Sequence, residues 1–304
     1  MLVLIFHRVL PRQDLLFPHE MHAQRFDQLC AWLSTWFQVL PLEEAIQRHR
    51  AGSLPAAAAA ITFDDGYADN HHVALPILKR HGLHATFFVA DGFLDGGCMW
   101  NDRVIESLRQ TNHQMIDLSR PAHGGLGYFS LSSLQARRHA IDTIIRQIKH
   151  LVPDVRAARV DAVVQACGVT LPDDLMMSSE QVRALHNSGM SIGGHTVTHP
   201  ILAVLDEATA KHEISSNRDR LAAITGAPVN VFAYPNGKLG ADYTPAVRDW
   251  VEACGYECAV STNVGTLRAG QDLFQIPRYT PWESSKLRVA LRFAQALNTG
   301  RVRS

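Results

Sequence analysis

The chain has 304 residues, with 29 Lys or Arg against 29 Asp or Glu, so its formal net charge is zero. Hydrophobic residues make up 46% of it, a proportion typical of a globular protein with a substantial core. A neutral balance without a Lys/Arg-rich stretch argues against nucleic acid or an anionic membrane surface as a partner, because both require a concentrated basic face.

Short apolar runs alternate with longer stretches of helical spacing along most of the chain. The first part predicts strands at residues 2–6, 37–40, 59–63 and 84–89, with helices at 24–36, 42–50 and 70–81 between them. After residue 175 the pattern predicts strands at 190–193, 229–233 and 258–261. A helix precedes each of them, and the first of these helices begins with a capping box formed by Ser178 and Gln181. Apolar strands separated by helices indicate a parallel sheet covered on both faces, either doubly wound or closed, and we expect an incomplete or distorted barrel.

The alternation breaks down between residues 92 and 175. Helical patterns cover residues 130–151 and 155–167, and a Gly-rich segment lies at 123–127. We therefore expect a mainly helical insertion at about 96–175 within a single domain that spans residues 1–304. The charged helix faces of this insertion suit either a solvated surface or a cap that grips a substrate.

No apolar run approaches the roughly 18 residues of a membrane span, so no transmembrane segment is expected. The run at residues 1–6 is also too short for the core of a signal peptide. If Met1 is the native start, we expect the protein in the cytoplasm. Nothing in the sequence specifies an oligomeric state.

Polar clusters follow several predicted strands at the point where each strand ends. His7 follows the first strand, Asp64 and Asp65 follow the third, His195 and His199 follow the strand at 190–193, and Tyr234 follows the strand at 229–233. Active sites of parallel α/β folds are assembled at the carboxyl ends of the strands, so these side chains are expected to converge. Taken singly, each cluster has a structural explanation, and a lone histidine such as His7 is commonly a core residue.

A catalytic zinc ion typically takes three protein ligands and leaves a fourth position to water. Asp65, His195 and His199 provide one carboxylate and two imidazoles for such a site. The spacing of the two histidines would place both imidazoles on one side of a helical turn that begins after the strand. Asp64 is then free to act as the general base on a water molecule.

Three motifs make the chain resemble the polysaccharide deacetylase family, also known as carbohydrate esterase family four. They are Thr62-Phe63-Asp64-Asp65-Gly66, then His195-Thr196-x-x-His199-Pro200, then Phe232-Ala233-Tyr234-Pro235-Asn236-Gly237. The likeness covers residues 1–95 and 176–280. It implies a distorted (β/α)₇ barrel, a divalent metal, most often Zn²⁺, and removal of N-acetyl groups from amino sugars in a glycan or glycan precursor.

The resemblance also implies roles for single residues. Asp64 corresponds to the catalytic base, and Asp65, His195 and His199 correspond to the metal ligands. The segment Tyr234-Pro235-Asn236 corresponds to the motif whose backbone N–H, here that of Asn236, holds the oxyanion. This chain lacks the Arg that often begins that motif, and it has no Leu-x-His motif after residue 212.

A circularly permuted subgroup that acts in exopolysaccharide biosynthesis accounts for both departures. Its N-terminal aromatic-His-x-Val motif is similar to Phe6-His7-Arg8-Val9, which implies that His7 is the general acid. Its late Pro-Arg pair is similar to Pro277-Arg278. By this likeness Arg278 replaces the missing Arg as partner of Asp64, although a surface ion pair is an equal alternative.

Two tryptophans, Trp100 and Trp282, are candidates for a sugar subsite together with Tyr234 and Pro235, because sugars stack on aromatic rings; packing is the alternative.

Two other functions are compatible with the aspartates and histidines of the predicted site. The site would also suit an allantoinase-like amidohydrolase that acts on a small non-sugar amide. A catalytically inactive sugar-binding barrel is the third alternative, and an intact set of two aspartates and two histidines argues against it.

Overall fold

A computed structural model describes residues 1–120, 125–283 and 285–299, and the chain divides into two compact units. Unit 1 comprises Met1–Arg12, Met21–Asp95 and Met176–Ser304, and unit 2 comprises Gln13–Glu20 and Gly96–Leu175. Among the described residues, no helix combines the length and apolar character that crossing a bilayer requires.

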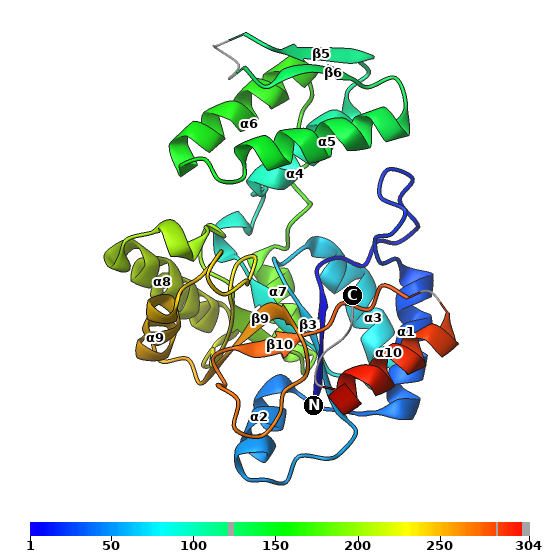
Figure 1. The fold of residues 1–304 in the computed structure, drawn as a ribbon, viewed down its shortest axis with the longest axis vertical. Coiled ribbons are helices and arrows are strands. Elements are labelled where there is room, and N and C mark those ends of the chain that lie inside the picture. Colours follow the sequence, from blue (N-terminus) through cyan, green and yellow to red (C-terminus); the bar gives the residue numbers. More distant parts are fainter. Residues whose placement is uncertain (121–124, 284, 300–304) are drawn as a thin grey trace. The chain divides into compact units, whose positions relative to one another are not determined.

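Unit 1 is built on a parallel sheet in the order β1-β3-β4-β7-β8-β9-β10, and β2 pairs in parallel with the first residues of β3. Figure 1 labels β3, β9 and β10 of this sheet, with helices around them. The strands are β1 (Leu2–Phe6), β2 (Gln38–Val39), β3 (Ala58–Phe63), β4 (Thr86–Val89), β7 (Ser191–Gly194), β8 (Val231–Ala233), β9 (Cys258–Val264) and β10 (Ile276–Arg278). The edges meet because the Tyr279 N–H donates to the Val3 carbonyl at 2.8 Å and the Ile5 N–H donates to the Tyr279 carbonyl at 3.1 Å. The prediction of a distorted (β/α)₇ barrel is confirmed.

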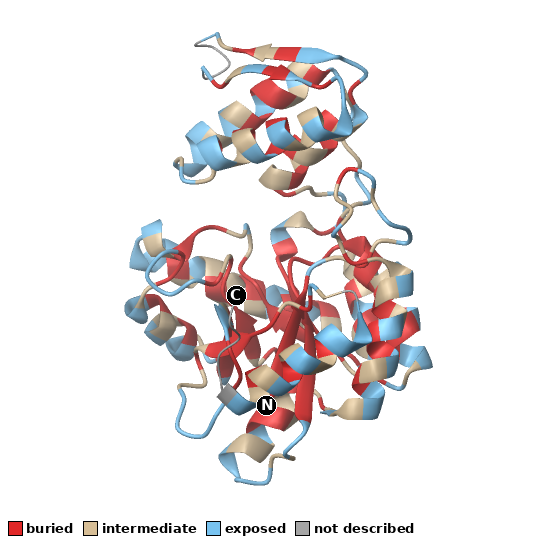
Figure 2. Cartoon of the chain, turned by 45° about the vertical axis from the view of Figure 1, so that its right-hand side comes forward, coloured by how far each residue is buried: buried red, intermediate tan, exposed pale blue. Residues whose placement is uncertain are grey.

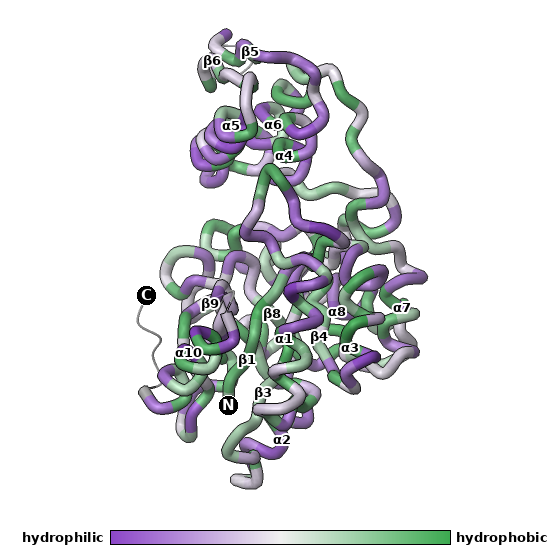
Figure 3. The backbone as a smooth tube through the Cα atoms, turned by 90° about the vertical axis from the view of Figure 1, so that its right-hand side faces the viewer, coloured by the Kyte–Doolittle hydropathy of each residue, from purple (hydrophilic) through white to green (hydrophobic). Residues whose placement is uncertain are grey.

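The strands of unit 1 are apolar on both faces because helices and the barrel interior exclude water from them. Every residue of β1, β3 and β4 is buried, which Figure 2 shows as red strands at the centre of the unit. The same strands are among the hydrophobic segments of the tube in Figure 3. In the register of β1 against β3, Phe6 lies opposite Phe63, so the residues that follow the two strands begin at the same level.

Helices connect most of the successive strands of unit 1, and one helix follows the last strand. The connecting helices are α1 (Ala23–Trp36), α2 (Leu42–Arg50), a π-helix (Asn70–Ala74) that continues into α3 (Leu75–Arg80), α7 (Ser179–Asn187), α8 (Glu207–Thr225) and α9 (Pro245–Ala253), with 3-10 turns at Asp91–Phe93 and Leu202–Val204; α10 (Lys286–Thr299) follows β10. The capping box predicted at Ser178 is confirmed: its side chain accepts from the Gln181 N–H, and the Gln181 side chain accepts from the Ser178 N–H.

Unit 2 has a hydrophobic core of its own, formed by α4 (Trp100–Gln110), α5 (Leu134–Ile148), α6 (Pro153–Cys167) and an antiparallel ribbon of β5 (Met115–Leu118) and β6 (Gly127–Ser130). The predicted helices at 130–151 and 155–167 match α5 and α6 approximately. The ribbon was not predicted, because two four-residue strands with a Gly-rich connection carry too short a pattern to separate from a loop. Of that Gly-rich segment, His123 and Gly124 lie outside the described residues.

Candidate metal centre and active site

Polar side chains of unit 1 gather where the parallel strands end. His7 follows β1, Asp64 and Asp65 follow β3, His195 follows β7, and Arg278 is the last residue of β10. Parallel strands present their carboxyl ends at one edge of the sheet, so residues that are distant in sequence meet there.

Asp65, His195 and His199 form a group that could hold a metal ion. Their nearest potential ligand atoms all lie within 4.8 Å of one another. Asp65 Oδ1 lies 3.3 Å from His195 Nε2 and 3.4 Å from His199 Nε2. Two ligand atoms about 2.1 Å from a tetrahedral Zn²⁺ would be about 3.4 Å apart, so the spacing suits a shared cation.

The same carboxylate oxygen supports this fit in a second way. Asp65 Oδ1 is buried and accepts no hydrogen bond from the described part of the chain, a state that is costly for a carboxylate unless a cation or a donor compensates it. Burial alone would raise the pKa of Asp65, but the neighbouring imidazoles outweigh burial and hold the pKa below its ordinary value. The residues present therefore fit a divalent metal.

Burial and the neighbouring carboxylates shift the pKa values of the two histidines in opposite directions. Burial lowers the pKa of His199 to about 4, so this imidazole is neutral at neutral pH and has a lone pair to offer. Burial lowers the pKa of His195 as well, but the carboxylates of Asp65 and Asp64 outweigh burial and raise it above its ordinary value.

His195 is oriented by three neighbours. Its Nδ1 lies 2.7 Å from the Ala233 carbonyl oxygen, which can only accept, so Nδ1 carries the proton and Nε2 faces Asp65. Its backbone N–H donates to Asn217 Oδ1 at 2.9 Å. Gly194 permits this approach, because a Cβ there would collide with the Tyr256 hydroxyl and lie 2.8 Å from Asn217 Oδ1.

The prediction that His195 and His199 share a helical turn is wrong. The residues between β7 and the 3-10 turn form a loop in which Thr196 and His199 have φ of 65° and 52°. A right-handed helix cannot contain such residues. The two imidazoles meet because the loop folds back on itself, with the His199 N–H donating to Thr196 Oγ1 at 3.1 Å.

Left-handed backbone is concentrated at this site. Five residues other than glycine have positive φ among the described residues, and Asp65, Thr196, His199 and Asn236 are four of them. Each such residue costs on the order of 1–3 kcal/mol and persists only where its surroundings impose it. Strain of this kind is typical of functional sites.

Asp64 is bound by Arg278 in a fully buried ion pair. The guanidinium donates to both carboxylate oxygens at 2.6 Å, and the side chains of Arg278 and Asp64 are 0% and 3% exposed. Arg278 also donates to Thr62 Oγ1 at 3.1 Å and to the Ser261 carbonyl at 2.9 Å. The pair is therefore not the surface ion pair that the sequence left open.

The charge of Arg278 determines the ionisation of Asp64. Burial would raise the pKa of this carboxyl, but the guanidinium outweighs burial and holds the pKa below its ordinary value. Asp64 is consequently an ionised carboxylate at neutral pH. It has lone pairs beyond the two that Arg278 occupies.

His7 is exposed at the end of β1, near enough to Asp64 and Asp65 for its charge to lower the pKa of both. Its carbonyl oxygen accepts from Asn70 Nδ2 at 2.9 Å. The next turn is held by Asp69, whose carboxylate accepts from the Val9 N–H at 2.9 Å and from Arg8 Nε at 2.8 Å. The loop after β3 thus fixes the end of β1.

The predicted substrate-binding residues differ in their surroundings. Tyr234 is fully buried, stacks on Tyr243 and donates its hydroxyl to the Phe274 carbonyl, so its ring is a packing element and cannot contact a sugar. Pro235 is also buried, whereas Trp282 is 65% exposed. Trp100 belongs to unit 2, where the guanidinium of Arg156 lies over its ring.

The sequence did not indicate the positioning role of three residues, Asp69, Asn70 and Asn217. Asp69 and Asn70 lie four and five residues after Asp65, and this proximity to the motif was a usable signal. Asn217 lies in α8, where amide side chains are ordinary, so nothing local distinguished it.

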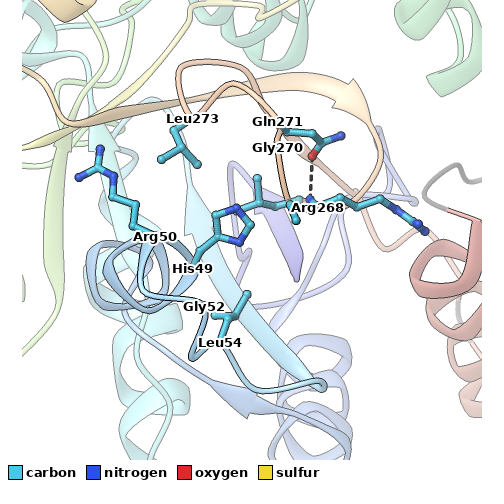
Figure 4. A pocket seen from close by; sticks show the side chains of 10 residues that line it. His49, Arg50, Gly52, Leu54, Arg268, Gly270, Gln271 and Leu273 are labelled. Atoms are coloured by element: carbon cyan, nitrogen blue, oxygen red, sulfur yellow. Dashed lines mark hydrogen bonds between the residues drawn. The ribbon is translucent and has the colours of Figure 1, made fainter.

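A separate cavity of about 480 Å³ lies away from these residues, between the end of α2, residues 52–54 and the loop at 267–273. Figure 4 shows the side chains of Arg50 and Arg268 extending to opposite sides of it. Arg50 donates to the Glu257 carbonyl, and Arg268 donates to the Leu297 carbonyl in α10. Because these two arginines point away from each other, no group of polar side chains from the described residues converges in the cavity. The carboxyl ends of the strands are therefore the stronger candidate site.

Comparison with known proteins identifies the family. A family model described as polysaccharide deacetylase matches residues 51–120 and 147–259, which is more than half of the chain. The chain belongs to the polysaccharide deacetylase family. The match includes Asp64, Asp65, His195 and His199 but not His7 or Arg278, so the placement of those two rests on geometry.

Relatives of this deacetylase are distant in sequence. YxkH of Bacillus subtilis, whose name assigns it to the polysaccharide deacetylases, is 19% identical over 278 residues, which are 91% of this chain and 69% of YxkH. Among solved structures, the Streptococcus pyogenes deacetylase PplD has a TM-score of 0.63 and 17% identity over 98% of both chains. IcaB from Ammonifex degensii has a TM-score of 0.59 and 18% identity over 97% of this chain and 96% of its own. These structures share the fold of the chain.

Proposed function

We propose that the protein is a metal-dependent hydrolase that removes N-acetyl groups from an amino sugar in a glycan or glycan precursor. Family membership supports glycan deacetylation. One observation carries the proposal: the buried Asp64–Arg278 ion pair directly precedes Asp65, whose buried Oδ1 has no hydrogen-bond partner among the described residues. The imidazoles of His195 and His199 lie beside that oxygen.

Asp65, His195 and His199 would hold the divalent cation, for which Zn²⁺ is the best candidate given one carboxylate and two imidazoles. When bound, such a cation polarises a carbonyl oxygen and lowers the pKa of water. The chain's own contribution is to direct Nε2 of His195 toward this site, since its Nδ1 donates to the Ala233 carbonyl.

Asp64 is proposed as the general base. Its carboxylate is ionised, and Arg278 fixes both of its oxygens, so the orientation of the remaining lone pairs is determined. The carboxylate would accept a proton from the attacking water. Arg278 would orient Asp64 and keep it charged without contacting the substrate.

His7 is proposed as the general acid that protonates the leaving amine. Its exposure allows contact with a substrate, and the hydrogen bonds made by Asp69 and Asn70 fix the backbone that follows it, at the His7 carbonyl and the Val9 N–H. The backbone N–H of Asn236 is proposed as an oxyanion donor. Its positive φ and the hydrogen bond from Thr262 Oγ1 to its carbonyl fix the direction of that segment.

Substrate contact remains a prediction for Trp282, whose exposed ring is available for stacking, and for the backbone of Tyr234 and Pro235. We also propose substrate contact for Trp100, and a cytoplasmic location for the protein. A single 1–304 domain with an inserted segment is proposed as the domain organisation.

Acetate release from N-acetylglucosamine oligomers, with and without a chelator, tests the proposed activity. Asp64→Asn should retain the metal and lose about 10²–10⁴-fold in turnover, because the amide cannot accept the proton. Unchanged turnover would refute the base assignment. A parallel assay on ureides separates the amidohydrolase alternative, and a protein that binds the oligomers without turnover would be the inactive barrel.

A further inference from the structure

The loop that carries His199 is held by one carboxylate from α8. Glu213 Oε2 accepts the N–H of Val197 at 2.9 Å and the N–H of Thr198 at 2.8 Å. Glu213 Oε1 accepts the Thr198 hydroxyl at 2.8 Å. Three donors of two consecutive loop residues therefore converge on a single side chain, which is not one of the candidate metal ligands.

This loop needs external support because of its backbone. Thr196 and His199 have left-handed backbone conformations, and they flank the two residues, Val197 and Thr198, that donate to Glu213. The loop is also supported from the β4 side, where the Gly92 N–H donates to the Val197 carbonyl at 2.9 Å. A Cβ at Gly92 would lie only 2.5 Å from that carbonyl oxygen, so the contact depends on glycine.

The two histidines differ in how they are held. His195 directly follows β7, and the Ala233 carbonyl and the Asn217 side chain fix its ring and its backbone independently of Glu213. Among the described residues, the hydrogen bond that holds His199 is the local one from its N–H to Thr196 Oγ1, so its position depends on the conformation of residues 196–198. Disorder in that loop would displace His199 first.

We propose that Glu213 is a positioning residue of the metal centre: its carboxylate holds the loop so that His199 Nε2 stays beside Asp65 Oδ1 and His195 Nε2. This inference rests on the ligand set of the proposed function. Glu213 acts on the loop through its three hydrogen bonds, so this role does not require the negative charge of its carboxylate. A neutral acceptor of the same shape should serve nearly as well.

Zn²⁺ affinity of the metal-free protein, measured by competition with a chelating dye, tests the proposal. Outer-shell partners of metal ligands typically contribute 10- to 100-fold in affinity, and we expect Glu213→Ala to weaken Zn²⁺ binding by about that factor. Glu213→Gln keeps an oxygen acceptor for the two N–H groups and should restore most of the affinity. Glu207→Ala is the matched control, since Glu207 also lies on α8 and its carboxylate pairs with Lys211 of the same helix, away from the loop.

Hydrogen exchange gives a readout that needs no metal. The amides of Val197 and Thr198 should exchange faster in metal-free Glu213→Ala than in the wild type, with unchanged exchange in β7 and α8. If Glu213→Ala does not fold, Thr198→Val carries the test, because it removes one donor to Glu213 and leaves both N–H groups. A smaller loss of Zn²⁺ affinity is then expected.

The outcomes separate the inference from the proposed function. If the wild type binds no divalent cation, the proposed ligand set of Asp65, His195 and His199 is wrong, and the proposed role of Glu213 is refuted as well. If the wild type binds Zn²⁺ and folded Glu213→Ala or Thr198→Val binds it equally well, only the positioning role is overturned. Equal losses in Glu213→Gln and Glu213→Ala would mean that charge, not hydrogen bonding, is what matters.

Discussion

Replacing Arg278 by Gln should test how Asp64 is kept ionised in the barrel. The substitution removes four hydrogen bonds donated by the guanidinium, to both Asp64 oxygens, to Thr62 and to the Ser261 carbonyl. It leaves a carboxylate that is 3% exposed without its cation. Breaking a buried ion pair from one side typically costs about 3–5 kcal/mol of folding free energy.

The size of that cost should depend on pH. In the wild type the pKa of Asp64 is depressed, so the pair contributes stability above the ordinary pKa of aspartate and loses it as the pH falls through the depressed value. Without Arg278, burial raises the pKa of Asp64, and the variant becomes relatively more stable as the carboxyl is protonated. The difference between the two proteins should therefore be largest at neutral pH and shrink toward acid.

Urea unfolding followed by tryptophan fluorescence measures this difference, because four of the five tryptophans belong to unit 1. Arg278→Lys keeps the positive charge but not the bidentate hydrogen bonds to Asp64, so we expect an intermediate loss of folding free energy. Arg48→Gln is the control, since Arg48 forms an exposed helix pair with Glu44 that contributes only about 0.3–0.5 kcal/mol. Wild-type stability of Arg278→Gln at neutral pH would refute the reasoning.

Two further predictions concern the histidine ligands. Gly194→Ala should destabilise unit 1 by about 1–3 kcal/mol, because the added Cβ collides with the Tyr256 hydroxyl, and unchanged urea unfolding would contradict the packing argument. Zn²⁺ affinity should fall as the pH drops below the pKa of His195, by up to about tenfold per unit, because this pKa is raised and the imidazole must lose its proton to bind. Competition titrations at several pH values check this, and a flat profile below neutrality would contradict it.

The sequence alone predicted the alternating strands and helices of unit 1 as far as β9, and the edge of the sheet that carries the chemistry; β10 and α10 were not predicted. Strand and helix periodicities are local, and parallel strands necessarily bring the residues that follow them to one end. For this reason the sequence was enough to place Asp64, Asp65 and His195 together. The two short strands of unit 2 were missed because four residues hold too little periodicity.

Only the tertiary structure decided how the site is held. Arg278 and Asp64 are 214 positions apart, so their pairing and burial depend on closure of the barrel between β10 and β1. The left-handed loop at Thr196 and His199 depends on Glu213 in α8, which the local sequence could not reveal. Local residue patterns determine which groups are present, whereas contacts between distant segments determine their geometry and charge state.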